Sequence, residues 1–109
     1  MAKYDSNGRL LKNKGTNFFD KLSVSSASFD DNKTSWDFTS QGFSIVIESS
    51  NASDVIEYSF DGTELHGDLT PGFSGIMIWD DRRQNKIWFR RKTAGSAVIV
   101  RVEAWRNDY

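Results

Sequence analysis

The chain has 109 residues, of which 38% are hydrophobic and 14% aromatic, enough for one domain whose core is built largely from aromatic side chains. It contains no cysteine, which excludes disulfides and thiolate metal sites. The formal net charge of −1 argues against a nucleic-acid-binding domain, and the chain shows neither a run of about 20 apolar residues nor a signal-peptide pattern. We therefore expect no bound nucleic acid, no membrane span and no signal peptide.

Charge is distributed unevenly along the chain. Residues 1–17 carry a net charge of +3, whereas residues 18–109 carry a net charge of −4. The first segment is polar and shows neither helical nor strand periodicity. We therefore predict an extended or disordered, basic N-terminal arm over residues 1–17 and a folded domain over residues 18–109. The arm could be a terminus without a role, or it could order on a partner through Lys3, Tyr4, Arg9, Leu10 and Leu11.

Short apolar alternations separated by turn residues predict β-strands in the first half of the domain. The pattern at Phe43, Ile45 and Ile47 is the clearest, since Ser44 and Glu48 alternate with these apolar residues. Further alternations lie at Leu22 and Val24 and at Trp36 and Phe38. No segment shows a convincing 3.6-residue apolar period, the pattern typical of an amphipathic helix.

The dipeptide Asp61-Gly62 is the strongest turn signal in the chain. Asp-Gly favours the two positive-φ positions of a type I′ turn. We therefore predict a two-residue hairpin between strands at residues 55–60 and 63–66. Its register pairs Phe60 with Thr63, Tyr58 with Leu65, and Glu57 with His66.

A strand with two chemically different faces is predicted from Lys86 to Arg91. Ile87 and Phe89 point to one side as ordinary core, because strand side chains alternate. The opposite face carries Lys86, Trp88 and Arg90, and the basic residues in and around the strand are Arg82, Arg83, Lys86, Arg90, Arg91 and Lys92. Arginine and tryptophan together favour docking on a protein partner. The alternatives are a solvated edge that blocks aggregation and a nucleic-acid patch, against which the acidic domain argues.

The remaining strands complete the predicted fold. Residues 76–79 are apolar on both faces. Residues 98–105 alternate between a buried face of Val98, Val100, Val102 and Ala104 and an outer face of Ile99, Arg101, Glu103 and Trp105. Seven or eight short strands at a spacing of about 8–12 residues predict an all-β domain, a single antiparallel β-sandwich of the jelly-roll type.

No catalytic or metal-binding motif stands out in the sequence. His66 is the only histidine, and we interpret it as a hairpin residue facing Glu57 rather than as a ligand or a base. The aspartates near turns lack the spacing of a glycosidase pair or a calcium loop: Asp30, Asp31, Asp37, Asp61, Asp80 and Asp81. We expect no enzymatic activity, no catalytic residues, no cofactor and no metal.

The tryptophans suggest another class of function. Trp36, Trp79 or Trp105, if exposed, could stack on sugar rings as in carbohydrate-binding modules, although large aromatic side chains more often build the core. We least expect Trp105 to be buried, because it shares a strand face with Arg101 and Glu103.

Three segments resemble small accessory structural proteins of tailed bacteriophage virions. They read IEYSFDGTELHGDLTPG from Ile56, KIWFRR from Lys86 and VRVEAW from Val100, and the resemblance covers residues 43–105. It implies a small β-domain on the capsid, neck or tail that forms homo-oligomers, with a trimer as one option. It also implies a terminal arm that extends onto a neighbouring subunit, and it carries over no active-site residues.

We therefore predict a non-enzymatic structural component of a phage virion, assembled in the host cytoplasm. The first candidate is a capsid decoration or cement protein that binds its own copies and the major capsid protein or another virion structural protein. The alternatives are a neck or tail adaptor of the same particle and a glycan-binding β-sandwich module. The predicted partner-binding residues are Lys3, Tyr4, Arg9, Leu10, Leu11, Arg82, Arg83, Lys86, Trp88, Arg90 and Trp105.

Overall fold

The computed structural model describes residues 16–71 and 75–106, which form eight strands and one short 3-10 helix. The strands are β1 (Thr16–Val24), β2 (Lys33–Ser40), β3 (Gly42–Glu48), β4 (Ile56–Ser59), β5 (Gly67–Leu69), β6 (Ile76–Trp79), β7 (Gln84–Arg91) and β8 (Val98–Arg106). The 3-10 helix η1 spans Phe29–Asp31 and lies between β1 and β2. Within these described ranges, no helix has the length and hydropathy of a transmembrane segment.

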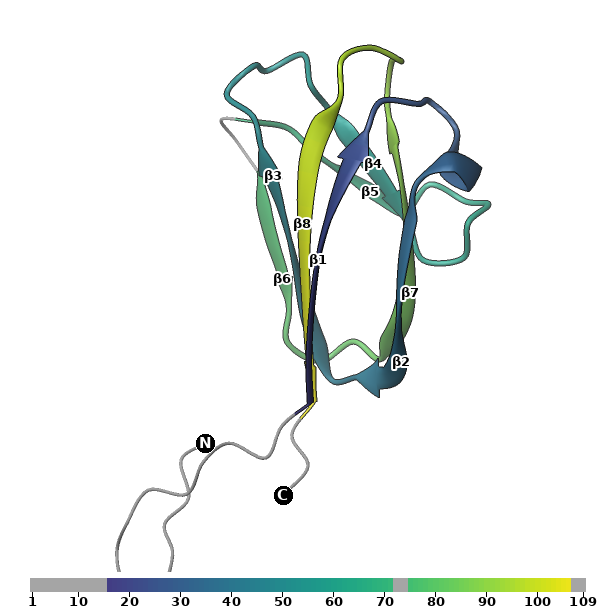
Figure 1. Cartoon of the computed structure of the whole chain (residues 1–109), viewed down its shortest axis with the longest axis vertical. Coiled ribbons are helices and arrows are strands. Elements are labelled where there is room, and N and C mark those ends of the chain that lie inside the picture. Colours follow the sequence, from purple (N-terminus) through teal and green to yellow (C-terminus); the bar gives the residue numbers. More distant parts are fainter. Residues whose placement is uncertain (1–15, 72–74, 107–109) are drawn as a thin grey trace, which may run out of the picture.

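The described strands form two antiparallel sheets that face each other, with strand orders β1-β8-β3-β6 and β2-β7-β4-β5 (Figure 1). The pairing is nested along the chain, so that the first strand pairs with the last and each following strand pairs with the one before it from the end: β1 with β8, β2 with β7, β3 with β6 and β4 with β5. A long two-stranded ribbon wound onto itself gives this order, which is that of an eight-stranded jelly roll. The predicted all-β jelly-roll sandwich is confirmed.

The core lies between the inner faces of the two sheets, where alternate residues of each strand meet. Phe43 and Ile45 of β3 and Ile87 and Phe89 of β7 are fully buried, as their alternation predicted. The buried hydrophobic cluster comprises Val24, Trp36, Phe38, Phe43, Ile45, Ile47, Ile56, Tyr58, Leu69, Ile87, Phe89, Val98, Val100, Val102 and Ala104. Aromatic rings supply much of this contact, which is how a small domain gains apolar burial from few residues.

The two-residue hairpin predicted at Asp61-Gly62 is wrong. β4 ends at Ser59 and β5 begins at Gly67, so Tyr58 lies opposite Gly67 rather than Leu65. Gly62 has the positive φ of 82°, but no described residue other than glycine has a positive φ, so Asp61 does not provide the other half of a type I′ turn.

Side chains hold the wider loop over residues 60–66 in place. Asp61 Oδ1 accepts hydrogen bonds from the backbone N–H groups of Thr63 at 2.8 Å and Glu64 at 2.9 Å. Ser59 Oγ accepts another from the Gly62 N–H at 2.9 Å. Since these bonds satisfy the backbone locally, the chain does not need the tight turn that the dipeptide favours.

The first described strand begins two residues before residue 18, where the folded domain was predicted to start. β1 begins at Thr16, so Thr16 and Asn17 belong to the strand and pair with Arg106 and Trp105 of β8. The predicted contact residues of the arm lie outside the described residues: Lys3, Tyr4, Arg9, Leu10 and Leu11. The start of β1 and the end of β8 lie side by side at one end of the sandwich (Figure 1).

Candidate docking faces

Two outer faces of the sandwich carry the candidate contact residues. The charged face is the outer face of β2-β7-β4-β5 and presents Lys86, Trp88 and Arg90 of β7. The apolar face is the outer face of β1-β8-β3-β6 and presents Phe19, Ile76, Ile78 and Trp105.

Arg90 on the charged face is held by partners within the chain. Its Nε donates to Glu57 Oε1 at 2.8 Å, and the Glu57 side chain is only 10% exposed. Its guanidinium also lies 4.1 Å from the centre of the Phe29 ring, at the start of η1. Register explains the ion pair, because Glu57 of β4 lies directly opposite Arg90 of β7.

Trp88 is half-buried, so it is neither sealed in the core nor fully presented to solvent. Its indole lies against Gly62, where a Cβ atom would come within 2.7 Å of the ring. The ammonium of Lys86 lies 4.9 Å from the ring centre. The loop over residues 60–66 therefore covers part of Trp88, which we predicted from the sequence to be a contact residue.

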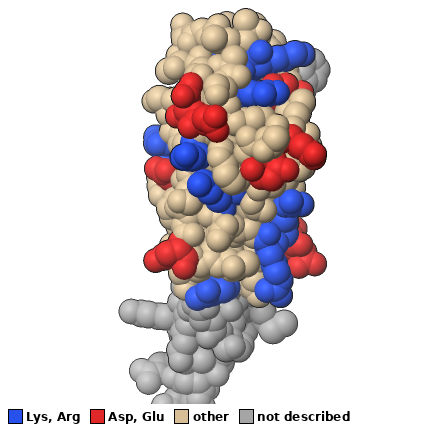
Figure 2. Space-filling model, turned by 90° about the vertical axis from the view of Figure 1, so that its right-hand side faces the viewer, with Lys and Arg blue, Asp and Glu red and all other residues tan. Residues whose placement is uncertain are grey.

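Arg82 and Arg83 lie in the exposed connection between β6 and β7. The Arg82 guanidinium lies 3.9 Å from the centre of the Phe60 ring. Figure 2 shows the side of the molecule on which β2 and β7 lie, and basic side chains are interspersed there with acidic ones. A nucleic-acid-binding surface is expected to carry an extended basic patch. The mixture of charges on this side does not form one.

Arg91 serves the fold rather than a surface. It is buried, forms an ion pair with Asp54 at 3.0 Å, and donates to the carbonyl groups of Thr93 and Ser96 at 2.8 Å each. It thereby ties together the connections before β4 and after β7. Like Arg90, Arg91 is therefore held by contacts within the chain.

The apolar face exposes large hydrophobic side chains. Phe19 is 51% exposed, and Ile76 and Ile78 are each 62% exposed. Phe19 and Ile78 lie in one row across the sheet, through Glu103 of β8 and Ser44 of β3. Large apolar side chains that share one sheet face favour contact with another macromolecule.

The sequence interpretation did not single out Phe19, Ile76 or Ile78. One sequence signal could have found Phe19, but none indicated the exposure of Ile76 and Ile78. Phe18 and Phe19 are adjacent in a strand, so they point to opposite faces and one must lie outside. The strand Ile76–Trp79 is apolar on both faces, which suits a buried central strand, yet β6 lies at a sheet edge.

Trp105 sits at the end of the apolar face in a groove. Its indole lies over Gly42 of β3, where a Cβ atom would come within 2.6 Å of the ring. The groove has a volume of about 260 Å³ and is lined by Asn17, Phe18, Phe19, Glu103, Ala104 and Trp105. Trp105 is half-buried, which agrees with its expected place on the outer face of β8.

The other two tryptophans considered for sugar stacking belong to the core region. Trp36 is 6% exposed, and its Nε1 donates to the Gln84 carbonyl at 3.1 Å. Trp79 stacks on Phe43 with ring centres 4.7 Å apart and packs against the buried cluster. A platform of exposed tryptophans at Trp36 and Trp79 is therefore wrong, because both point inward from their strands.

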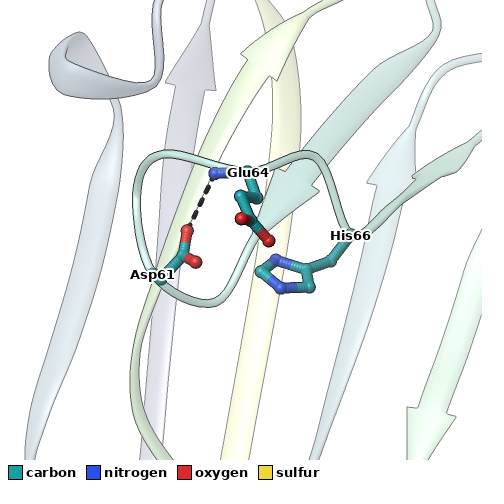
Figure 3. Close-up of side chains that lie close together, drawn as sticks. All are labelled: Asp61, Glu64 and His66. Atoms are coloured by element: carbon teal, nitrogen blue, oxygen red, sulfur yellow. Dashed lines mark hydrogen bonds between the residues drawn. The ribbon is translucent and has the colours of Figure 1, made fainter.

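Asp61, Glu64 and His66 form the one group of three potential metal ligands among the described residues (Figure 3). Their ligand atoms lie within 4.8 Å of one another, and all three residues are exposed. Hydrogen bonds from the backbone N–H groups of Glu64 and Thr63 lower the pKa of Asp61, so its carboxylate stays charged.

The side chains of Asp61 and His66 stabilise their own loop through hydrogen bonds to its backbone. His66 Nδ1 accepts the Phe60 N–H at 3.0 Å, so a neutral imidazole carries its proton on Nε2. A metal ion requires an unprotonated ring nitrogen, so binding here would first have to break that bond. The predicted contact between His66 and Glu57 is wrong, because Glu57 lies opposite Asp68 and pairs with Arg90.

No protein-family model matches the chain, and no curated protein matches it significantly. The function must therefore be argued from the chain's own residues. Those residues divide into a charged face whose cations largely have partners within the chain and an apolar face whose exposed hydrophobic side chains lie beside the ion-paired Lys21, Glu48 and Arg101.

Proposed function

We propose that the chain is a non-enzymatic docking domain that acts as a structural component of a phage virion. The observation that carries the docking part is the exposure of Phe19, Ile76 and Ile78 on one sheet face, beside the half-buried Trp105. A partner that covers this face would remove apolar area from water at about 25 cal/mol per Å². Binding would therefore be driven mainly by the apolar face.

The arrangement of polar groups supports a role in binding rather than catalysis. In the exposed cluster of Asp61, Glu64 and His66, the side chains of Asp61 and His66 accept hydrogen bonds from the backbone of their own loop. General acid–base catalysis needs a base that is free to reach a substrate proton, preferably in a cleft that excludes water. An exposed loop whose only imidazole accepts a backbone hydrogen bond does not meet this requirement.

The placement on a virion rests on the resemblance in sequence and on the suitability of the fold. Jelly rolls occur in viral capsid and lectin domains, although a fold by itself does not fix a function. On a repeating lattice, several weak contacts per protomer add up to strong retention. The basic arm over residues 1–15 would add a second contact beside the apolar face, because β1 starts next to Trp105.

The virion proposal is tested by the composition of particles. Mass spectrometry of gradient-purified phage particles from the encoding strain should find the full-length chain together with capsid and portal proteins. A constant ratio to the major capsid protein would assign decoration, whereas a copy number matching one ring would assign a neck or tail adaptor. Recovery of the chain solely in the soluble fraction would overturn the proposal.

A variant lacking residues 1–15 and the variant Phe19→Ser separate the two contacts. Each should lower the amount of chain retained on particles while the protein stays folded by circular dichroism, because Phe19 is 51% exposed and the arm precedes β1. Equal retention of wild type and both variants would remove these contacts from the proposal.

Glycan binding is the second candidate function, and the groove at Trp105 favours it. The half-buried indole beside Gly42, in a groove also lined by Asn17 and Glu103, combines an aromatic surface with hydrogen-bonding groups. A glycan array should then show a bound saccharide that the variant Trp105→Ala no longer retains. An array without specific binding by the wild-type chain would reject this candidate.

A further inference from the structure

The edge strands of the two sheets differ in how they are protected. A bare strand edge offers unpaired backbone groups to other chains, and proteins commonly block this with charged side chains. Among the described edge strands, β1, β2 and β5 each contain charged residues: Asp20 and Lys21, Lys33 and Asp37, and Asp68. β6 reads Ile-Met-Ile-Trp and contains none.

The backbone of β6 has hydrogen-bonding groups directed away from its own sheet. The Gly75 carbonyl accepts the Ile47 N–H of β3 at 2.9 Å, which marks that pair as hydrogen-bonded. Hydrogen-bonded and non-hydrogen-bonded pairs alternate along antiparallel strands, so Met77 and Trp79 continue the pattern toward β3. The backbone N–H and C=O groups of Ile76 and Ile78 therefore point away from β3, along the open edge of β6.

We propose that the β6 edge is the self-association surface of this chain and pairs antiparallel with β6 of a second copy. The register places Ile76 opposite Ile78 of the second copy, and Met77 opposite Met77 of the second copy. The outward groups of both isoleucines then form the hydrogen-bonded pairs, and the first sheets of the two copies join into one. This inference names the surface for the self-association included in the proposed function, and in that respect rests on it.

Self-complementarity is the reason to choose a second copy as the occupant. In this register every residue meets one that points to the same face, so the four isoleucines gather on the joined apolar faces. Val46 lies beside Ile76 in the same sheet and extends the contact. Asp80 follows β6 directly, so the two copies place this charge at opposite ends of the paired strands, and like charges are not opposed.

The solution state of the full chain tests the surface. Sedimentation equilibrium over micromolar to millimolar concentrations should show a dimer for the wild type. The variant Ile78→Lys should lose the dimer, because it places a charge at each hydrogen-bonded pair. Phe19→Lys is the matched control, since Phe19 is similarly exposed on the same face but at the opposite sheet edge, and it should remain dimeric.

Engineered cysteines test the register, and the chain has no cysteine of its own to interfere. Under mild oxidation, Met77→Cys should give a disulfide-linked dimer. Ile76→Cys and Ile78→Cys should cross-link poorly alone but form a heterodimer when mixed, because each lies opposite the other. Phe19→Cys serves as the background rate for random collision.

Each outcome decides one point. A wild-type chain that stays monomeric over the whole range, or a Met77→Cys variant that cross-links no faster than Phe19→Cys, overturns the β6 pairing. A dimer that survives Ile78→Lys also overturns it while leaving self-association intact through another surface. The virion proposal is judged separately, by whether the chain is found on purified particles. Circular dichroism confirms that each variant is folded.

Discussion

The charged face and the apolar face of this sandwich differ in how far their candidate contact residues are already held by contacts within the chain. On the charged face, Arg90 is paired with a buried glutamate and Trp88 is partly covered by a loop. On the apolar face, Ile76 and Ile78 remain 62% exposed. A tryptophan between cations therefore does not by itself indicate a free contact surface, because the chain's own loops and opposite charges can occupy it first.

The largest effect is expected at Arg90, where the loss of stability tests whether this cation is held within the chain or free to bind. The variant Arg90→Met leaves the Glu57 carboxylate without its ion-pair partner, and we expect the free energy of unfolding to fall by about 2–3 kcal/mol, below the cost for a fully buried pair because the Arg90 side chain is 30% exposed. Urea denaturation monitored by tryptophan fluorescence measures this loss. Arg83→Met, in the exposed connection before β7, is the matched control and should change stability by no more than about 0.5 kcal/mol. Equal effects would mean that Arg90 is as free as Arg83.

The place of Trp105 on the apolar face depends on Gly42. In Gly42→Ala, the new Cβ atom would lie 2.7 Å from the Trp79 carbonyl oxygen and 2.6 Å from the Trp105 ring, and the backbone oxygen cannot move aside easily. We expect a loss of about 1–2 kcal/mol and a shift in tryptophan emission as the indole is displaced.

Gly75→Ala is the control for this change, because its Cβ atom would meet Ile47 at an ordinary 3.4 Å. Its stability should stay close to that of the wild type in the same denaturation assay. A Gly42→Ala variant with unchanged stability and emission would show that the indole does not rest on this glycine.

Acid sensitivity sharpens the distinction between residues that hold the fold and residues that are free to bind. Hydrogen bonds from Ser49 and Arg91 lower the pKa of Asp54 below its ordinary value. The stability that this carboxylate contributes is therefore fully present above its unfolded pKa of about 3.9 and is lost as the pH falls through the lowered folded value.

The variant Asp54→Asn should lower the melting temperature at neutral pH and reduce its further decline in acid. Thermal melts from neutral pH to about pH 2.5 measure both effects. Ser49→Ala removes one of the two hydrogen bonds, so its melting curve should lie between those of the wild type and Asp54→Asn. A wild type and Asp54→Asn pair with parallel pH profiles would contradict this account.

The candidate contact residues could be read from the sequence in part. Alternation correctly placed Lys86, Trp88 and Arg90 on one side of β7, and it placed Trp105 on the outer face of β8. It could not reveal that Glu57 would neutralise Arg90, because the two residues are 33 positions apart and meet through strand pairing. The exposure of Ile76 and Ile78 was hidden for the same reason, since a doubly apolar strand is typical of a sheet centre.

The sequence by itself determined the strand character of the chain and its buried positions, because side-chain alternation is a local property of extended backbone. The buried residues of β3, β7 and β8 follow that pattern. Tertiary structure alone decided the width of the 60–66 loop and the edge position of β6. Both depend on which distant strands pair, and that choice follows from the free energy of the whole sandwich rather than from any short stretch of residues.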